Sequence, residues 1–344
     1  MKLRSLLYTA IISAVTLGVV SCSDDDLDPN SIFPDISNEL DPNSYSFQLD
    51  SFLKREYLSN YNLDFKYKME DVGTDMNYNL VPARYDASVD LATLTKFLWF
   101  DVYDKVAGTD FLKAYGPRII HLIGSPAFNP SSGTMILGLA EGGIKVSLYR
   151  VNYIDPTNAA ALNEYYFHTM HHEFAHILHQ TRNYPTEYDL LSNTFYDPTG
   201  WQNRDDRVCN SFGCVTAYGS SEEREDFAEV VATYIVATDE EWDSIMYYAG
   251  RNFVQVGNDN YGNPTYDDPE SAQDSQGGMA DGADGVSILN QKINIIRSWF
   301  RDSWGFEIDS IRAEVQRRQA ELPLDSIRKW VYEIEVPTTG GNAE

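Results

Sequence analysis

Basic residues are scarce in this chain. Lys and Arg together number 26 against 52 Asp and Glu, and the formal net charge of the 344 residues is −26. Nucleic acids and anionic lipid surfaces bind proteins mainly through Lys and Arg, so both are poor partners for so acidic a chain. Solubility explains this charge, although a cationic peptide could also be drawn to it.

Long apolar runs are lacking too. The run between residues 6 and 20 follows two basic residues and is too short for a spanning helix, which is the pattern of an export signal. Its end, Val19-Val20-Ser21-Cys22, resembles a lipobox. We therefore predict a lipoprotein signal peptide over 1–21 and a lipidated Cys22, held firmly by its acyl chains. An ordinary signal peptide with an incidental Cys is the alternative.

Cysteine is rare, with three residues in the whole chain. Beyond Cys22 there remain Cys209 and Cys214, and two Cys alone cannot close a structural zinc site that needs four ligands. An exported protein meets an oxidising environment, so the short spacing predicts a disulfide between them. Such a bond would fix the loop that leads to Tyr218.

Histidine is also sparse, yet five of the six residues lie between His168 and His179. This segment contains the motif H-E-x-x-H, from His172 to His176. Residues four apart share one face of a helix, so both imidazoles can reach one metal ion. Glu173 is placed to take a proton from a water molecule that zinc activates. The alternative is a buried helix that carries these residues by chance, but buried His and Glu need partners, which a metal supplies.

The third ligand must come from another segment. His168 and His176 are separated by about 12 Å of helix rise, which zinc–nitrogen bonds of about 2 Å cannot bridge. His179 fails as a partner of His172 for the same reason. The metzincin pattern fails as well, because His179 and Arg182 stand where it requires Gly and His. A carboxylate further along the chain is therefore expected.

The best candidates lie in the acidic run 220–229. Ser220 and Glu223 have the spacing of a capping box that begins a helix. One turn into this helix, Glu225 is the preferred third ligand, and Glu229 would hold a ligand imidazole by its other N–H. Three other acids remain alternatives for the ligand, namely Glu222, Asp226 and Glu229. The run could also be a solvated first turn favoured by the helix dipole.

The remaining pattern predicts an α+β catalytic domain over 45–335, after a flexible acidic tether over 22–44 and before a disordered tail over 336–344. The irregular segment 183–219 should border the cleft, where Tyr196 and Trp201 are candidates for substrate contact. The segment 250–285 reads as a mobile surface loop rather than a calcium site built on Asp281 and Asp284. Helices are expected over 91–106, 159–182, 288–300 and 308–320, and strands over 118–124, 134–140 and 144–152.

Three segments together carry a family resemblance: the H-E-F-A-H-I-L-H-Q run over 172–180, Ala217-Tyr218-Gly219-Ser220-Ser221, and the acidic run 225–229. They resemble the zinc-binding metallopeptidases called substrate import-associated zinc metallohydrolase lipoproteins, over nearly the whole mature chain. The Tyr, the Glu seven residues on and the Glu four further are similar to lethal-factor-type gluzincin peptidases. The resemblance implies a zincin-like fold with a short mixed sheet, an HExxH helix, a helical C-terminal part and one Zn²⁺ per chain. It also implies that Tyr218 stabilises the oxyanion, Glu225 binds zinc and Glu229 supports a ligand.

The same resemblance implies a location and partners, but no substrate. Members are lipid-anchored surface proteins of Gram-negative bacteria that are associated with outer-membrane nutrient importers. The acidic run 23–28 is similar to their surface-export signal. We thus expect an outer-membrane protein anchored through Cys22, facing the cell exterior, near an importer complex. Its substrate would be a peptide or a glycoprotein. The rival is a nutrient-capture lipoprotein with a structural metal site; hydrolysis of a glycoconjugate is a third option.

Overall fold

The computed structural model describes residues 40–69, 80–128, 135–136, 138–141, 145–251, 253, 255–258, 264–266 and 284–337. The chain divides into two units, Met1–Asp41 and Pro42–Glu344, and nearly all described residues belong to the second. The predicted signal peptide, Cys22 and most of the predicted tether lie outside the described residues. Within the described ranges, no helix combines the length and the apolar character needed to span a bilayer.

A small mixed sheet forms the strand-containing part of the second unit. Its strand order is β1-β2-β6-β5, with the first three strands parallel and β5 antiparallel to β6 at one edge. Phe65, Ile120 and Val146 lie side by side in the register and are all buried. The strands are β1 (Asp64–Lys66), β2 (Ile119–Leu122), β5 (Gly138–Glu141) and β6 (Lys145–Leu148), with separate pairs β3 (Ala127–Phe128) with β4 (Met135–Ile136) and β7 (Gln255–Asn258) with β8 (Pro264–Tyr266).

Helices precede the sheet strands and pack around them. The helix predicted over 91–106 is a helical stretch from Tyr85 to Ala107, and residues 87–90 extend its buried part toward the N-terminus. It ends at Gly108, whose φ of 89° a side chain would disfavour. The elements of this region are α2 (Phe47–Leu53), η2 (Lys54–Leu58), α3 (Ser59–Tyr61), α4 (Tyr85–Thr95), η3 (Lys96–Phe100), α5 (Asp101–Ala107) and α6 (Thr109–Tyr115).

The helix that carries the H-E-x-x-H motif is where the sequence predicted it. Asn158 caps its beginning by accepting a hydrogen bond from the Ala161 amide, and α7, η5 and α8 then follow without a break to Thr181. After η4 (Val151–Tyr153), the elements are α7 (Ala159–Leu162), η5 (Asn163–Phe167), α8 (His168–Thr181), η6 (Tyr188–Leu190), η7 (Trp201–Asn203), α9 (Asp206–Ser211), η8 (Tyr218–Ser220), α10 (Glu223–Val236) and α11 (Asp239–Ala249).

The predicted capping box at Ser220 and Glu223 is wrong. The residue before α10 is Glu222, and no side chain caps this helix. Ser220 lies within η8, two residues before the N-cap Glu222, and its hydroxyl donates to the Ala217 carbonyl. The acidic first turn of α10 still favours the helix through the helix dipole.

The C-terminal part is helical, as predicted. The helices expected over 288–300 and 308–320 are confirmed as α12 and α13. Asp284, considered for calcium, is the N-cap of α12 and accepts the Ser287 amide at 3.0 Å. Asp281 lies outside the described residues. The elements are α12 (Gly285–Trp299), η9 (Phe300–Trp304), α13 (Ile308–Ala320) and α14 (Leu324–Tyr332).

The predicted disulfide is not formed in the structure. Cys209 and Cys214 are both free, fully buried thiols that pack with Phe195, Val208 and Phe253. Burial raises the pKa of Cys209 to about 12 and also raises that of Cys214, so both remain thiols near neutral pH. The Cys214 amide donates to the Cys209 carbonyl at 3.0 Å, so the turn after α9 closes through its backbone rather than through sulfur.

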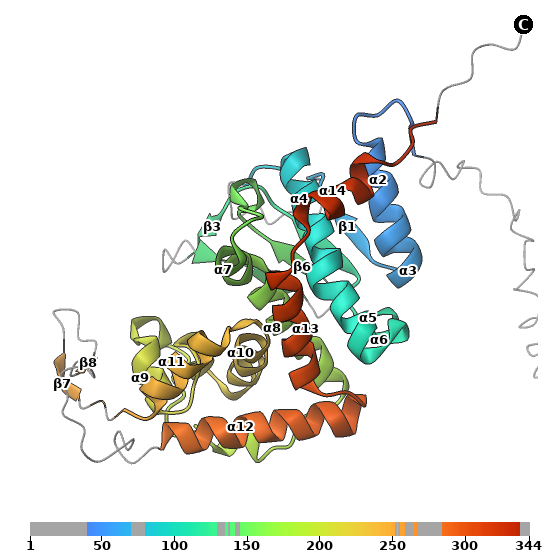
Figure 1. The fold of residues 1–344 in the computed structure, drawn as a ribbon. Helices are drawn as coiled ribbons and strands as arrows, with labels where there is room; N and C mark the ends of the chain where they lie inside the picture. Colours follow the sequence, from blue (N-terminus) through green and yellow to red (C-terminus); the bar gives the residue numbers. More distant parts are fainter. Residues whose placement is uncertain are drawn as a thin grey trace, which may run out of the picture. The chain divides into compact units, whose positions relative to one another are not determined.

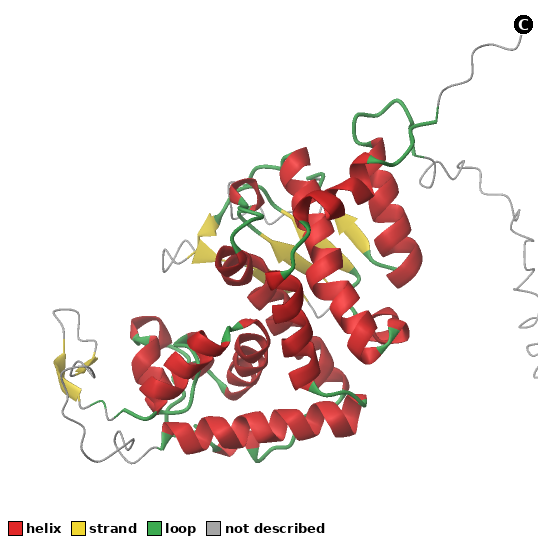
Figure 2. Cartoon of the chain, in the orientation of Figure 1, coloured by secondary structure: helices red, strands yellow, loops and turns green. Residues whose placement is uncertain are grey.

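One large apolar cluster joins the sheet and the helices of both halves of the second unit. Figure 1 shows α8 and α10 in the middle of this unit, where they contact each other, with α12 along the lower side. Figure 2 shows the strands of the main sheet in the upper half of the view and helices throughout the lower half. The architecture is therefore α+β, with the motif helix placed between the two parts.

Candidate metal site

The local sequence of α8 separates an apolar face from a histidine face. Phe174, Ala175 and Leu178 are buried in the main apolar cluster. His172 and His176, four residues apart, lie on the face that meets α10. The motif thus presents two imidazoles toward a second helix, as the spacing predicted.

Three side chains meet between the two helices. The Nε2 atoms of His172 and His176 lie 3.1 Å apart, and Oε2 of Glu225 lies 3.1 Å from the first and 3.3 Å from the second. Metal–ligand bonds of about 2.1 Å at tetrahedral angles would place the ligand atoms about 3.4 Å apart. The triangle therefore fits one face of a zinc tetrahedron. Among the His, Cys, Asp and Glu side chains of the described residues, these three form the group that could hold a metal ion.

Each imidazole has a close polar neighbour at its other nitrogen. Nδ1 of His172 lies 2.8 Å from Oε1 of Glu229, and Nδ1 of His176 lies 2.9 Å from Nε2 of His179. These partners orient the two Nε2 atoms toward Glu225. Glu229 was expected in this place, whereas His179 was left without a role. Its position three residues after His176, on the same helical face, was the available signal.

The other acids considered for the metal are engaged elsewhere. Glu222 is exposed at the beginning of α10, and Asp226 forms a fully buried ion pair with Lys292. Glu229 contacts Nδ1 of His172, on the side away from the triangle. Glu225 is therefore the acid that the fold brings to the two imidazoles, and its role as a metal ligand remains a prediction.

The acids and imidazoles polarise one another strongly. Burial lowers the pKa of His172, but the Glu225 and Glu229 carboxylates outweigh it and raise that pKa to about 10. Burial raises the pKa of both acids, yet the histidines beside them hold the pKa of Glu225 well below its usual range and that of Glu229 at about 2. The two ionised acids thus favour a positive charge at this place, and a metal ion carries a charge of the same sign.

Tyr218 and Glu173 border the triangle. The Tyr218 ring lies 5.8 Å from the His172 ring and is 38 % exposed, so substrate can reach it. Burial and the Glu225 charge raise the pKa of Tyr218, so the phenol keeps its proton and can donate it in a hydrogen bond. Glu173 directly follows His172 on α8 and is partly exposed, and its charge adds, after those effects, to the raised pKa of Tyr218 and of His172.

The two loop aromatics proposed as substrate contacts have different positions. Trp201 packs edge-on against Tyr218 at 4.9 Å and is partly exposed, so it forms a wall beside the site. The Tyr196 hydroxyl donates to Asp226 at 2.7 Å, and this residue anchors the loop instead. The loop 183–219 therefore borders the site through Trp201.

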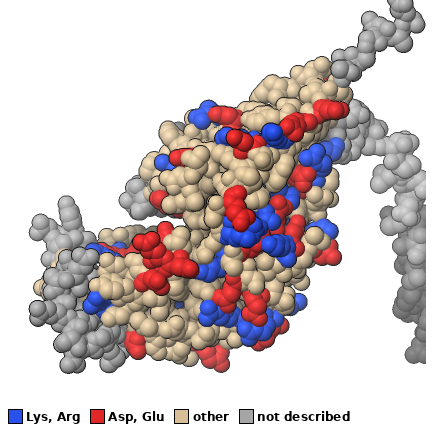
Figure 3. Space-filling model, viewed as in Figure 1, with Lys and Arg blue, Asp and Glu red and all other residues tan. Residues whose placement is uncertain are grey.

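Basic side chains on the surface of the described residues lie beside acidic ones. Lys105, Arg317 and Arg318 all lie within 2.7 Å of the Glu314 carboxylate. Figure 3 shows this pattern, with blue groups bordered by red ones, and shows the outline hollowed between the upper, strand-bearing part and the lower helices. Interleaved charges of this kind suit neither a nucleic-acid backbone nor an anionic membrane surface. The absence of nucleic-acid partners remains a prediction.

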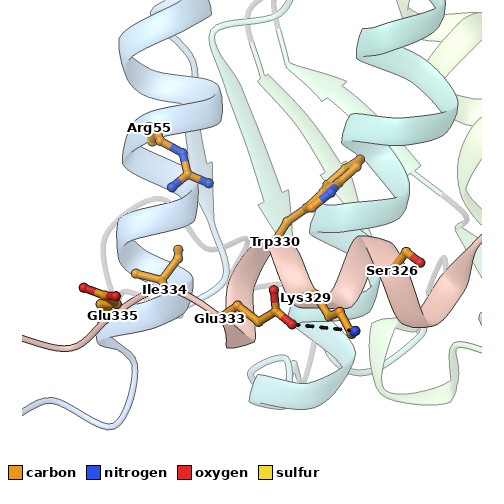
Figure 4. A pocket seen from close by; sticks show the side chains of 7 residues that line it. All are labelled: Arg55, Ser326, Lys329, Trp330, Glu333, Ile334 and Glu335. Carbon is orange, nitrogen blue, oxygen red and sulfur yellow. Dashed lines mark ion pairs between the residues drawn. The ribbon is translucent and has the colours of Figure 1, made fainter.

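A second hollow lies between η2 and α14. It encloses about 510 Å³ and is open to solvent, and Figure 4 shows the Lys329–Glu333 ion pair beside it. None of its residues belongs to the metal triangle. The lining residues are Arg55, Ser326, Lys329, Trp330, Glu333, Ile334 and Glu335.

The third ligand is tested by a pair of alanine variants. Glu225→Ala is expected to lower zinc affinity more than about 100-fold, above the range of about 10–100-fold for removing an outer partner, because it deletes a ligand atom. Glu222→Ala, three residues earlier and exposed, should leave zinc affinity unchanged. Zinc affinity would be measured by competition with a chelating indicator. The opposite order of the two variants would move the ligand to Glu222.

Known proteins resemble this chain over most of its length. A family described as “Putative zinc-binding metallo-peptidase” matches residues 43–309. A crystal structure from Bacteroides caccae ATCC 43185, described with the same words, is similar with 39% sequence identity and a TM-score of 0.63, covering 81% of this chain and 95% of the other. No curated protein matches the chain. The matched range contains α8, η8 and α10 with all the residues of the triangle, and the chain belongs to this family of zinc-binding metallo-peptidases.

Proposed function

We propose that the protein is a zinc-dependent peptidase of the gluzincin type, with a zincin-like catalytic domain. The observation that supports this most is the triangle of His172, His176 and Glu225, whose spacing fits zinc. A structural metal site would require neither Glu173 nor an exposed tyrosine beside it. Both are present, and they are the groups that hydrolysis of an amide needs.

Zinc binding, proton transfer and oxyanion stabilisation fall to different residues. His172, His176 and Glu225 would hold zinc, which when bound lowers the pKa of a water molecule to about 7 and polarises a carbonyl group. Glu173 accepts the proton of the attacking water and returns it to the leaving amine. The Tyr218 hydroxyl donates a hydrogen bond to the oxyanion that develops on the substrate carbonyl.

Strand β5 offers a place for an extended substrate. It is an edge strand that pairs with β6 on one side and contacts α8. An extended peptide can add to such an edge through its backbone hydrogen bonds. Together with Trp201 on the opposite segment, this strand supports a linear peptide rather than a compact small molecule as the substrate.

The proposal is tested by incubating zinc-loaded protein with a peptide library and with a glycoprotein, each with and without a chelator. Chelator-sensitive cleavage of peptides, restored by added zinc, is the expected result. Cleavage restricted to the glycoprotein would assign a glycoconjugate substrate. Tight binding of peptides without turnover, at full zinc loading, would replace the peptidase with a nutrient-capture protein.

We further propose that the protein is anchored to the outer membrane, faces the cell exterior and works beside a nutrient importer. This rests on the lipobox-like residues 19–22 and the acidic run after Cys22. Cys22→Ala is expected to move the protein from the membrane fraction to a soluble fraction, measured by fractionation and by acyl-chain labelling. Ser23→Ala should remain anchored. Membrane retention of unlabelled Cys22→Ala protein would contradict lipidation at this residue.

A further inference from the structure

Thr216 lies between the metal site and the turn that carries Tyr218. Its hydroxyl Oγ1 donates to Oε2 of Glu229 at 2.6 Å and accepts the Gly219 amide at 3.0 Å. A threonine hydroxyl has one proton to donate and lone pairs that accept, so both contacts can exist together. The residue is partly buried and lies two positions before the first residue of η8.

Both contacts of this hydroxyl lead directly into the site. On one side, Glu229 reaches Nδ1 of His172 with its other carboxylate oxygen, at 2.8 Å. On the other side, Gly219 directly follows Tyr218, so its amide fixes the turn that presents the phenol. A continuous chain of polar contacts therefore runs from a metal-facing imidazole to the backbone of Tyr218.

Two other hydrogen bonds hold the ends of the turn η8. Its entrance is held by the Ala217 amide, which donates to Asp206 at 2.6 Å, and its exit by the Ser220 carbonyl, which accepts the Asp197 amide at 2.8 Å. Both of these hold the turn to the loop and to α9. Of these hydrogen bonds, the one between Thr216 and Glu229 connects the turn to α10. The same helix carries Glu225.

We propose that Thr216 is a positioning residue that couples the orientation of the His172 imidazole to the position of Tyr218. It is not part of the triangle and acts through Glu229 and the Gly219 amide. The inference rests on the proposed function, since Tyr218 acts on an oxyanion only in a hydrolase. Because coupling is reciprocal, metal bound at His172 should also restrain the η8 turn.

The test compares Thr216→Val, which keeps the shape and removes the hydroxyl, with Thr216→Ser, which keeps the hydroxyl. In Thr216→Val we expect zinc affinity to fall about 10-fold, as for other outer partners of metal ligands. We expect hydrogen exchange of the Gly219 amide to become faster, and kcat to fall about 10-fold with little change in KM. Thr216→Ser should restore all three. Thr93→Val, a buried threonine in α4 whose hydroxyl bonds only to the carbonyls of its own helix turn, should change none of them.

A second pair of variants tests whether Thr216 acts through Tyr218. In a Tyr218→Phe background, Thr216→Val should lower zinc affinity as before but lower kcat much less, because the hydroxyl it positions is already gone. If Thr216→Val lowered kcat equally in wild-type and Tyr218→Phe protein, Thr216 would not act through Tyr218. Unchanged zinc affinity and Gly219 exchange in Thr216→Val would overturn the coupling itself. These two measurements need no substrate, so they decide the coupling even where the protein hydrolyses nothing and the proposed function fails.

Discussion

Replacing Glu173 by Gln is expected to lower kcat for peptide hydrolysis about 10²–10⁴-fold, the usual contribution of a general acid–base group. Gln has the same shape but cannot accept the proton of the attacking water. The zinc content should stay at one per chain, because the predicted ligands are His172, His176 and Glu225. Since the lost interaction belongs to the transition state, kcat and kcat/KM should fall together.

The exposure of Glu173 distinguishes it from Glu229, which also lies close to an imidazole. Glu229 is buried and held by Thr216 and His172, whereas Glu173 is partly exposed. A group that exchanges protons with water and substrate needs that access, and a group that orients an imidazole does not. Glu229→Gln should therefore weaken zinc binding more than Glu173→Gln does.

The control for Glu173→Gln is Glu240→Gln, an exposed acid near the beginning of α11. Both variants would be assayed on the best peptide from the library, with zinc content measured in the same samples by atomic absorption. Glu173→Gln protein that carries full zinc and cleaves at the wild-type rate would remove Glu173 from the reaction. Loss of zinc in this variant would instead place Glu173 among the groups that hold the metal.

The sequence was sufficient for those parts of the site that lie on one helix. The positions of His172 and His176 follow from the helical period alone, because residues four apart on a helix cannot separate. Glu225 needed one further assumption, namely that the acidic run forms a helix facing α8. The structure meets this assumption, because α8 and α10 are in contact. Glu225 and Glu229 are one helical turn apart on α10, and they lie at different nitrogens of His172.

The parts that depend on tertiary contacts were not predictable in the same way. The role of Thr216 requires η8 to lie against α10, and nothing in the spacing of residues 216 and 229 states this. The capping box failed because a hydroxyl can bond within η8 or to the following helix, and the pattern is the same in both cases. Strand β1 is three residues long, too short for an alternating pattern to show.

The ion pair between Lys292 and Asp226 was also outside what the sequence could indicate, since the residues lie 66 positions apart. Both side chains are fully buried. The Lys292 ammonium also donates to Ser192 at 2.9 Å and to the Gly213 carbonyl at 2.6 Å. It therefore joins α12, the loop 183–219 and the beginning of α10 at one point.

Lys292→Ala is expected to lower the free energy of unfolding by about 3–5 kcal/mol, because it leaves the Asp226 charge buried without a cation to balance it. Urea unfolding of zinc-free protein, followed by tryptophan fluorescence, would measure this loss. Lys329→Ala removes an exposed pair with Glu333 at 3.7 Å and should cost less than about 1 kcal/mol. Equal midpoints for the two variants would contradict a buried charge at Asp226.

The same variant shows whether this ion pair supports only the fold or also the metal site. Asp226 directly follows Glu225, so a shift at the beginning of α10 should displace the third ligand and weaken zinc binding. Zinc stabilises the folded state in proportion to the logarithm of its concentration over its dissociation constant. A tenfold weaker affinity would thus make the loss in saturating zinc about 1.4 kcal/mol larger than the loss without zinc. Equal losses of unfolding free energy with and without zinc would mean that Lys292 stabilises the fold but does not affect the position of Glu225.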